Sequence, residues 1–216
     1  CPIVREWGLT TGKYRIPEQK VIDDLLEGTG YKKIKLEGND LTMPDGMMID
    51  LGASAKGYTG DVVSEIFREN GISSAIISLG GNVQTVGSRP DGSDWKVAVR
   101  DPQNESEQIC IVSVSDKAVV TSGNYERYFI GEDGKRYCHI INPSDGYPVD
   151  NGIASVTIIS DSGILSDCLS TALFVMGKDE AFEYQKQNGG FEMIIVSSEN
   201  EVTYTEGLEG KIELLK

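Results

Sequence analysis

Residues 154–173 read ASVTIISDSGILSDCLSTAL, and this stretch predicts a strand that runs directly into a helix. The strand is expected over 154–160. From about Asp161 the apolar residues recur at helical spacing, and the pattern ends at Gly177. We expect this helix to bury one face, formed by Ile164, Leu165, Cys168, Leu169, Ala172 and Leu173.

The rest of the chain contains more strands than helices. Helical spacing predicts further helices over 17–27, from near 58 to 71, and around 180–187. Strands are expected at 31–36, 47–50, 74–79, 95–99, 109–114, 118–121, 127–130, 137–141, 191–196 and 202–205. Because the strands cluster instead of alternating strictly with helices, the pattern indicates an α+β fold. Because the chain contains neither a repeat nor a long linker, we expect one domain over residues 1–216.

Composition excludes several classes of protein. Of the 216 residues, 34 are acidic and 20 are basic, which gives a net charge of −14. Such a charge disfavours binding to nucleic acid or to anionic lipid. No apolar run is long enough to span a bilayer, and no signal-peptide pattern is present. A lipid anchor on Cys1 is conceivable, but residues 2–7 are more typical of the inside of a folded domain.

Cysteine and histidine usage excludes zinc sites built from paired ligands. Cys110, Cys138 and Cys168 form no CxxC pair, and we expect each to be a buried small side chain. His139 is the only histidine, which excludes His-pair metal sites. A single histidine in a strand is more often structural than catalytic, and the residues that follow, 142–146, form a strong turn sequence.

Two glycine-containing segments are candidates for ligand binding. Residues 49–58 lead from a strand through small residues to a helix start, where free N–H groups favour anions and Lys56 could meet a phosphate. Taken alone, however, the segment favours a tight strand-to-helix turn without a ligand. Gly80 and Gly81 follow a predicted strand, and they indicate either a plain turn or space for a flat ligand.

Asp167 and Thr171 are four residues apart, so they share one face of the predicted helix. A carboxylate and a hydroxyl one turn apart are hard oxygen ligands of the kind that Mg²⁺ prefers. The alternative is a carboxylate that only accepts a local hydrogen bond.

In their order along the chain, these segments resemble the ApbE-type flavin transferases (FAD:protein FMN transferases). The matching stretches are 50–58, 79–82, 100–102, 121–125, 127–129, 139–143, 146–149 and 167–175. The resemblance runs from about Trp7 to the C-terminus. It implies a single ApbE-like domain in which helices flank a mixed or antiparallel sheet.

The resemblance also implies roles for individual residues. Those expected to contact FAD are Asp50, Lys56, Gly81, Ser122, Gly123 and Ile141. The implied ligands of Mg²⁺ are the backbone carbonyl of Ala53 and the side chains of Asp167 and Thr171. His139 matches the family histidine, which we assign to proton handling or orientation during transfer, and Asp167 is the second expected catalytic residue.

The implied reaction moves FMN from FAD to a Thr or Ser hydroxyl of a target protein and releases AMP. The expected acceptor is a membrane redox subunit or an FMN-binding domain, and the resemblance alone implies an extracytoplasmic, membrane-anchored protein of a bacterial lipoprotein family. The alternatives are hydrolysis of FAD to FMN and AMP, or a non-catalytic flavin-binding module. The sequence departs from the family pattern at Asn142, where Asp is usual, and family members are longer at the N-terminus.

Overall fold

In the computed structural model, which describes residues 2–216, the predicted strand of the 154–173 stretch is strand β10 (Ile153–Ser160). All eight of its residues are buried. It pairs with β11 (Phe191–Ser197) on one side and β7 (Ala118–Gly123) on the other. These strands form the centre of a six-stranded sheet of order β12-β11-β10-β7-β4-β3. Cys1 lies outside the described residues.

A second, three-stranded sheet of order β13-β6-β5 covers one face of the first. The other strands of the two sheets are β3 (Ala75–Leu79), β4 (Asn82–Val86), β12 (Val202–Tyr204), β5 (Trp95–Arg100), β6 (Gln108–Val114) and β13 (Ile212–Leu214). Val99 and Val112 of the small sheet share one apolar core with Ile159 and Ile194 of the large sheet. Every strand pair that the structure describes is antiparallel, as the α+β prediction allowed.

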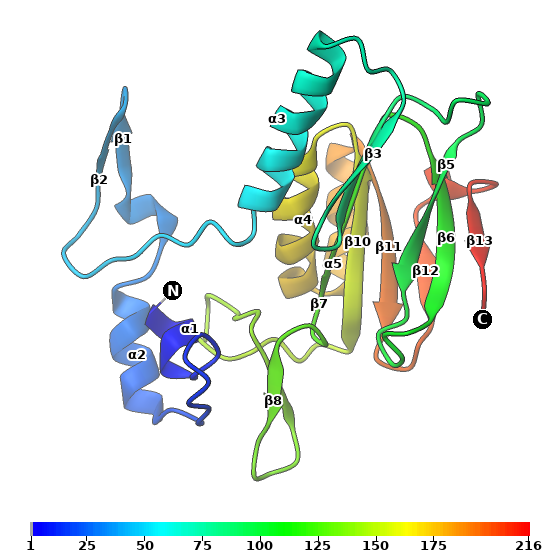
Figure 1. Cartoon of the computed structure of the whole chain (residues 1–216). Coiled ribbons are helices and arrows are strands. Elements are labelled where there is room, and N and C mark those ends of the chain that lie inside the picture. Colours follow the sequence, from blue (N-terminus) through cyan, green and yellow to red (C-terminus); the bar gives the residue numbers. More distant parts are fainter. Residues whose placement is uncertain (1) are drawn as a thin grey trace. The chain divides into compact units, whose positions relative to one another are not determined.

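Two helices, α3 (Ala55–Glu69) and α4 (Gly163–Met176), lie along the large sheet next to β4, β7 and β10 (Figure 1). With a helix on one face and the small sheet on the other, β10 has no solvent-exposed face, which explains why its serine and threonine residues are buried along with its apolar ones. The chain continues through α5 (Lys178–Asn188) and the short η2 (Glu206–Leu208). No helix of residues 2–216 is long and apolar enough to cross a membrane.

These elements belong to one of two units, which comprises Leu51–Gly123 and Asn151–Lys216 and is called the sheet unit below. The other unit, called the small unit, comprises the residues up to Asp50 together with Asn124–Asp150. Its elements are α1 (Pro2–Glu6), α2 (Gln19–Glu27), η1 (Tyr31–Lys33), β1 (Lys35–Glu37), β2 (Asp40–Thr42), β8 (Tyr128–Ile130) and β9 (Arg136–Cys138).

Trp7 is the centre of the small unit's core and is fully buried. It packs with Ile3 and Ile22, and its ring stacks on Tyr137 at a centroid distance of 5.2 Å. Its indole N–H donates to the carbonyl oxygen of Gly146 at 2.9 Å. This bond satisfies the one polar group of a buried tryptophan.

Most of the predicted elements are confirmed within a few residues, but two strand predictions are wrong. Residues 47–50 form no strand, and Met48 and Ile49 are exposed, so no buried face holds this segment extended. In the predicted strand 31–36, the first three residues form the 3₁₀ turn η1, and β1 begins only at Lys35.

The buried face of α4 also differs from the prediction. Leu169 and Leu173 are buried, but Ile164 and Leu165 are 40% and 43% exposed, and the expected Cys168 and Ala172 are exposed as well. The helix instead buries a stripe of small and polar residues that includes Gly163, Ser166, Asp167 and Ser170. Because α4 is apolar around most of its circumference, hydrophobic spacing could not identify the side that packs.

Candidate functional site

Gly163, Asp167 and Thr171 follow one another at intervals of four residues, so they form one stripe along α4. Asp167 is only 5% exposed, and its Oδ2 accepts a hydrogen bond from the backbone N–H of Gly57 at 2.9 Å. Gly57 is the third residue of α3, where backbone N–H groups have no partner within the helix. The carboxylate of Asp167 therefore caps the first turn of the neighbouring helix.

Two glycines allow α3 and α4 to approach closely enough for this bond. A Cβ atom at Gly57 would lie 2.1 Å from the carbonyl oxygen of Gly163 and 2.7 Å from the Cβ of Asp167. A Cβ atom at Gly163 would lie 2.5 Å from the carbonyl oxygen of Gly57. Any side chain at either position would separate the helices, so both glycines are required by the packing.

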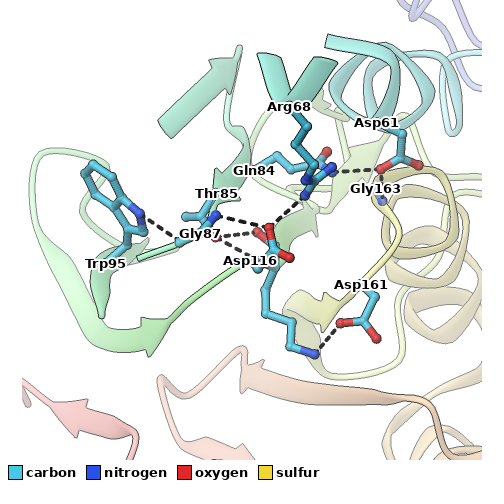
Figure 2. Close-up of polar contacts among 10 residues, drawn as sticks. Asp61, Arg68, Gln84, Thr85, Gly87, Trp95, Asp116, Asp161 and Gly163 are labelled. Carbon is cyan, nitrogen blue, oxygen red and sulfur yellow. Dashed lines mark hydrogen bonds and ion pairs between the residues drawn. The ribbon is translucent and has the colours of Figure 1, made fainter. Parts of the chain in front are cut away.

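The capping is reciprocal, because a carboxylate of α3 caps the first turn of α4. Asp61 Oδ1 accepts from the N–H of Gly163 at 2.6 Å (Figure 2). Its Oδ2 accepts from the N–H of Ile164 at 3.0 Å. The Ser162 hydroxyl and Gln84 Nε2 also donate to Asp61, at 3.2 and 2.8 Å. Negative charge at a helix N-terminus is favourable, so the bonds and the helix dipole act together.

The hydroxyl of Thr171 belongs to a chain of three hydroxyl groups. Ser122 Oγ lies 3.0 Å from Thr171 Oγ1 and 2.8 Å from Ser170 Oγ, and Ser170 Oγ donates to the carbonyl oxygen of Asp167 at 2.9 Å. Each hydroxyl has a single proton. Because Ser170 gives its proton to Asp167, Ser122 donates to Ser170 and Thr171 donates to Ser122. This order leaves the lone pairs of Thr171 Oγ1 to face a cation.

Ala53, Asp167 and Thr171 offer the chemistry that a magnesium ion needs. Ala53 lies in the turn two residues before α3, whose third residue contacts Asp167. No group of three or more His, Cys, Asp or Glu side chains suited to a metal occurs within residues 2–216. The donors expected here are instead a carbonyl, a carboxylate and a hydroxyl, all of them hard oxygens. A carboxylate can accept about four hydrogen bonds or ion contacts, so the bond from Gly57 leaves capacity on Asp167, and the donor set fits Mg²⁺.

Lys56 and the Gly80-Gly81 turn lie together beside these residues. The Nζ of Lys56 donates to the carbonyl oxygen of Gly80 at 3.3 Å. Both glycines have positive φ, 56° and 95°, and form the two-residue turn of the β3–β4 hairpin. This conformation favours glycine at both positions, so the turn is confirmed, and the space for a flat ligand beside it stays a prediction.

Asn82 follows this turn and was not among the predicted site residues. Its side chain is buried, and its Nδ2 has no hydrogen-bond partner among residues 2–216. Asn82 lines a small hollow together with Lys56, Gly57 and Gly163. A buried amide donor that faces a hollow beside a lysine is suited to an acceptor atom of a ligand.

The remaining candidates of the sheet unit lie at the end of β7. Ser122 takes part in the hydroxyl chain, and Gly123, the last residue of the strand, is buried and pairs with Ser155 of β10. Three of the predicted residues, Asp50, His139 and Ile141, belong to the small unit.

His139 lies just after β9, not within a strand as predicted, because β9 ends at Cys138. Its backbone N–H and its Nδ1 both contact the carbonyl oxygen of Arg127, at 2.9 and 3.2 Å. Since a carbonyl oxygen only accepts, Nδ1 donates, and in the neutral ring the lone pair is on Nε2. This is the tautomer in which Nε2 can act as a general base. Ile141 forms a bridge with Pro148 and packs against the core around Trp7.

Cys110, Cys138 and Cys168 are in their thiol form at neutral pH. Burial raises the pKa of Cys110 to about 11, and burial also raises the pKa of Cys138. Cys168 is exposed on α4, contrary to the prediction, yet partial desolvation and the adjacent Asp167 carboxylate raise its pKa as well. Thiolate chemistry therefore has no support at these three positions.

Like Asn82, Asp61 and Gln84 belong to this site but were not predicted from the sequence. A signal was present, because Gly57, Gly60, Asp61 and Ser64 share one face of α3 at helical spacing. A face of small residues with one carboxylate marks a close helix contact, but apolar spacing draws attention to the opposite face.

Comparison with known proteins shows which family the chain matches. Residues 1–195 match the model of the ApbE family. The chain is 33% identical to an FAD:protein FMN transferase of Klebsiella pneumoniae over 205 residues, which cover 93% of the chain and 63% of that relative. It is 29% identical to a protein of the same name from Treponema pallidum, over 98% of the chain and 63% of that relative.

Solved structures with the same fold include the ApbE protein of Thermotoga maritima, with a TM-score of 0.88 at 34% identity over 97% of this chain and 69% of the other. The flavinyl transferase ApbE of Pseudomonas stutzeri, in its apo form, gives a TM-score of 0.84 at 30% identity over 97% and 66% of the two chains. The chain thus spans about three fifths of the length of the curated relatives it matches.

Proposed function

The chain belongs to the ApbE family, and from this premise we propose that it transfers FMN from FAD to a Thr or Ser hydroxyl of an acceptor protein. The proposal includes Mg²⁺ as the required metal. One observation carries it: the stripe on α4 that holds Asp167 against Gly57 and Thr171 beside Ser122. The Asp167 carboxylate caps α3, and beyond this bond it keeps acceptor capacity one turn from the Thr171 hydroxyl, which is the donor chemistry that a metal–diphosphate site requires.

The proposed reaction is a phosphoryl transfer. The acceptor hydroxyl oxygen forms a bond to the FMN phosphorus of FAD, the bond from this phosphorus to the AMP oxygen breaks, and AMP leaves as an anion. His139 Nε2 is the proposed acceptor of the hydroxyl proton, and the bond from Nδ1 to Arg127 fixes the tautomer that this requires.

Asp167, Thr171 and the Ala53 carbonyl would hold the metal. When bound, Mg²⁺ neutralises diphosphate charge and stabilises the leaving oxygen. The net charge of −14 makes local positive charge necessary for any diphosphate to bind. Lys56, fixed near the β3–β4 turn, is the proposed side-chain contribution to it.

The other proposed FAD contacts are Asp50, Gly81, Ser122, Gly123 and Ile141. These five assignments follow from the resemblance of the sequence motifs, and all five residues lie within the range 1–195 that matches the family. For Ser122 the hydroxyl chain adds a second argument, because its contact with Thr171 couples it to a proposed metal ligand.

The test is an assay of covalent flavin transfer. The chain is incubated with FAD, MgCl₂ and a flavin-free FMN-binding domain that contains an acceptor threonine. We expect flavin fluorescence on the acceptor in a denaturing gel, with an equal amount of AMP released. Asp167→Ala should abolish both products. Asp161→Ala is the matched control, because it removes an exposed carboxylate just before α4 that pairs with Lys117.

Two other results would contradict the proposal. Release of free FMN and AMP without an acceptor would indicate hydrolysis of FAD. FAD binding without any product, unchanged in Asp167→Ala, would indicate a non-catalytic flavin-binding module.

We also propose that the natural acceptor is a membrane redox subunit or FMN-binding domain, and that transfer takes place outside the cytoplasm at a membrane. This assignment rests on the resemblance of the sequence motifs to the family alone. Cell fractionation with an antibody against the protein tests it, and recovery of all of the protein in the cytosol would contradict it.

A further inference from the structure

We propose that Asp61 is a positioning residue for the metal site, which it holds in place by fixing the start of α4. The inference rests on the proposed function, since it assigns Asp61 a task only if Asp167 and Thr171 bind a metal. Asp61 contacts neither of these side chains in the structure; it acts through the backbone of Gly163 and Ile164.

Four hydrogen-bond donors meet at the Asp61 carboxylate. Both oxygens are used: Oδ1 by Gly163 N–H and Gln84 Nε2, and Oδ2 by Ile164 N–H and the Ser162 hydroxyl. Bonds to a charged acceptor are roughly twice as strong as neutral ones. Four such bonds from two elements fix the position of this side chain closely.

Gln84, which belongs to β4, links both helices to the sheet. Gln84 is 7% exposed, and glycines make space for it. A Cβ atom at Gly60 would lie 2.5 Å from Gln84 Oε1, and one at Gly163 would lie 2.7 Å from the same atom. A shift of α4 along α3 would therefore break contacts with a buried strand as well as with Asp61.

The contact of Asp61 and Gln84 with the start of α4 also affects the proposed metal ligands Asp167 and Thr171, which lie on the same helix. Gly163 precedes Asp167 by one turn and Thr171 by two turns on the same stripe. If the bonds from Gly163 and Ile164 to Asp61 are lost, the first turn of α4 loosens, and Asp167 moves relative to Gly57. The Ser162 hydroxyl still accepts from Leu165 N–H at 3.3 Å and caps the helix, so α4 remains formed and only its position changes.

The experiment compares Mn²⁺ binding by the 216-residue chain in the presence of FAD, measured from the electron paramagnetic resonance signal of the free ion. In Asp61→Asn, the amide replaces one oxygen with a donor, so at least one of the two backbone N–H groups loses its acceptor. We expect affinity for Mn²⁺ to fall by about tenfold or more, as is typical when a residue that orients metal ligands is changed.

Asp116→Asn is the matched control. Asp116 accepts from Arg68 at 2.7 Å and from the N–H of Gly87 at 3.0 Å, at the other end of α3. Figure 2 shows both carboxylates, Asp61 beside Gly163 and Asp116 beside Gly87. This variant also removes one negative charge next to α3, but at the end of the helix away from α4. It should therefore leave the affinity for Mn²⁺ unchanged.

Gln84→Met provides a second variant should Asp61→Asn fail to fold. It retains the length of the side chain but removes the one donor that β4 gives to Asp61, and it should weaken Mn²⁺ binding by about threefold or more.

Asp167→Ala separates the two levels of the argument. If Asp167→Ala removes Mn²⁺ binding but folded Asp61→Asn and Gln84→Met bind it like the parent, the positioning role of Asp61 is wrong and the metal site stands. If Asp167→Ala binds Mn²⁺ like the parent, the proposed metal site is wrong, and the role of Asp61 is wrong with it.

Discussion

Gly57→Ala gives the sharpest test of the helix packing, because two physical effects predict opposite signs. By helix propensity alone, alanine in place of a glycine within a helix stabilises a protein by about 1 kcal/mol. In the structure, however, the added methyl group would lie 2.1 Å from the carbonyl oxygen of Gly163 and 2.7 Å from the Cβ of Asp167. These distances are far below van der Waals contact, and the nearer atom is backbone.

The magnitude follows from what must give way. Overpacking of a closely packed contact costs about 1–3 kcal/mol. Moving α3 away from α4 also weakens the 2.9 Å bond from Gly57 N–H to Asp167, and a bond to a charged group contributes about 1.5–3 kcal/mol. After subtraction of the gain in propensity, we expect the free energy of unfolding to fall by about 1.5–5 kcal/mol.

The assay is urea unfolding followed by circular dichroism, with the slope of the transition checked for constancy. Thr59→Ala, at an exposed position of the same helix, is the control and should change stability by less than about 0.5 kcal/mol. A Gly57→Ala protein as stable as the parent, or more stable, would refute the close contact between α3 and α4.

Two further predictions concern the folded state outside the proposed site. Burial raises the pKa of the Asp101 carboxyl, but its hydrogen bonds, chiefly from Lys216 at 2.5 Å, outweigh burial and hold this pKa below its usual range. The stabilisation from the Asp101 carboxylate is therefore complete above the unfolded pKa of about 3.9, and it is lost as the pH falls through the lower folded value. The variant Asp101→Asn should be less stable than the parent at pH 7 and should lose less stability when the pH is lowered. Urea unfolding midpoints measured between pH 2 and 7 test this expectation. Trp7→Phe removes the donor to the buried carbonyl of Gly146 and should cost about 1–3 kcal/mol, measured by thermal unfolding; an unchanged midpoint would contradict the role of this bond.

The sequence predicted the strands of the sheet unit well because their signals are local. The run 154–160 consists of small and β-branched residues, and Trp95, Val97 and Val99 alternate with Lys96, Ala98 and Arg100, as expected for a strand with one covered face. Both segments are strands in the structure, as β10 and β5. The alternation of β5 also appears in its burial, since Val97 and Val99 are buried and their neighbours are exposed.

Local pattern was insufficient where an apolar residue had no neighbouring element to cover it. Ile49 is apolar and lies in a segment that reads as a strand, yet it is exposed and belongs to no sheet. His139 was expected inside a strand, but β9 ends one residue earlier. Whether a strand forms at all, and where it ends, depends on hydrogen bonds to residues distant in the sequence, and hydrophobic spacing does not report these bonds.

The sequence by itself determined the α+β class, the positions of the main strands and helices, and the candidate pair of Asp167 and Thr171, because helical spacing alone puts two residues four apart on one face. Only the tertiary structure decided which side of α4 is buried. That choice depends on the absence of side chains at Gly57 and Gly163, which brings two backbones together and turns Asp167 and Asp61 into reciprocal caps. A glycine in a sequence shows where a close approach is allowed; the partner that makes use of it is fixed only when the chain is folded.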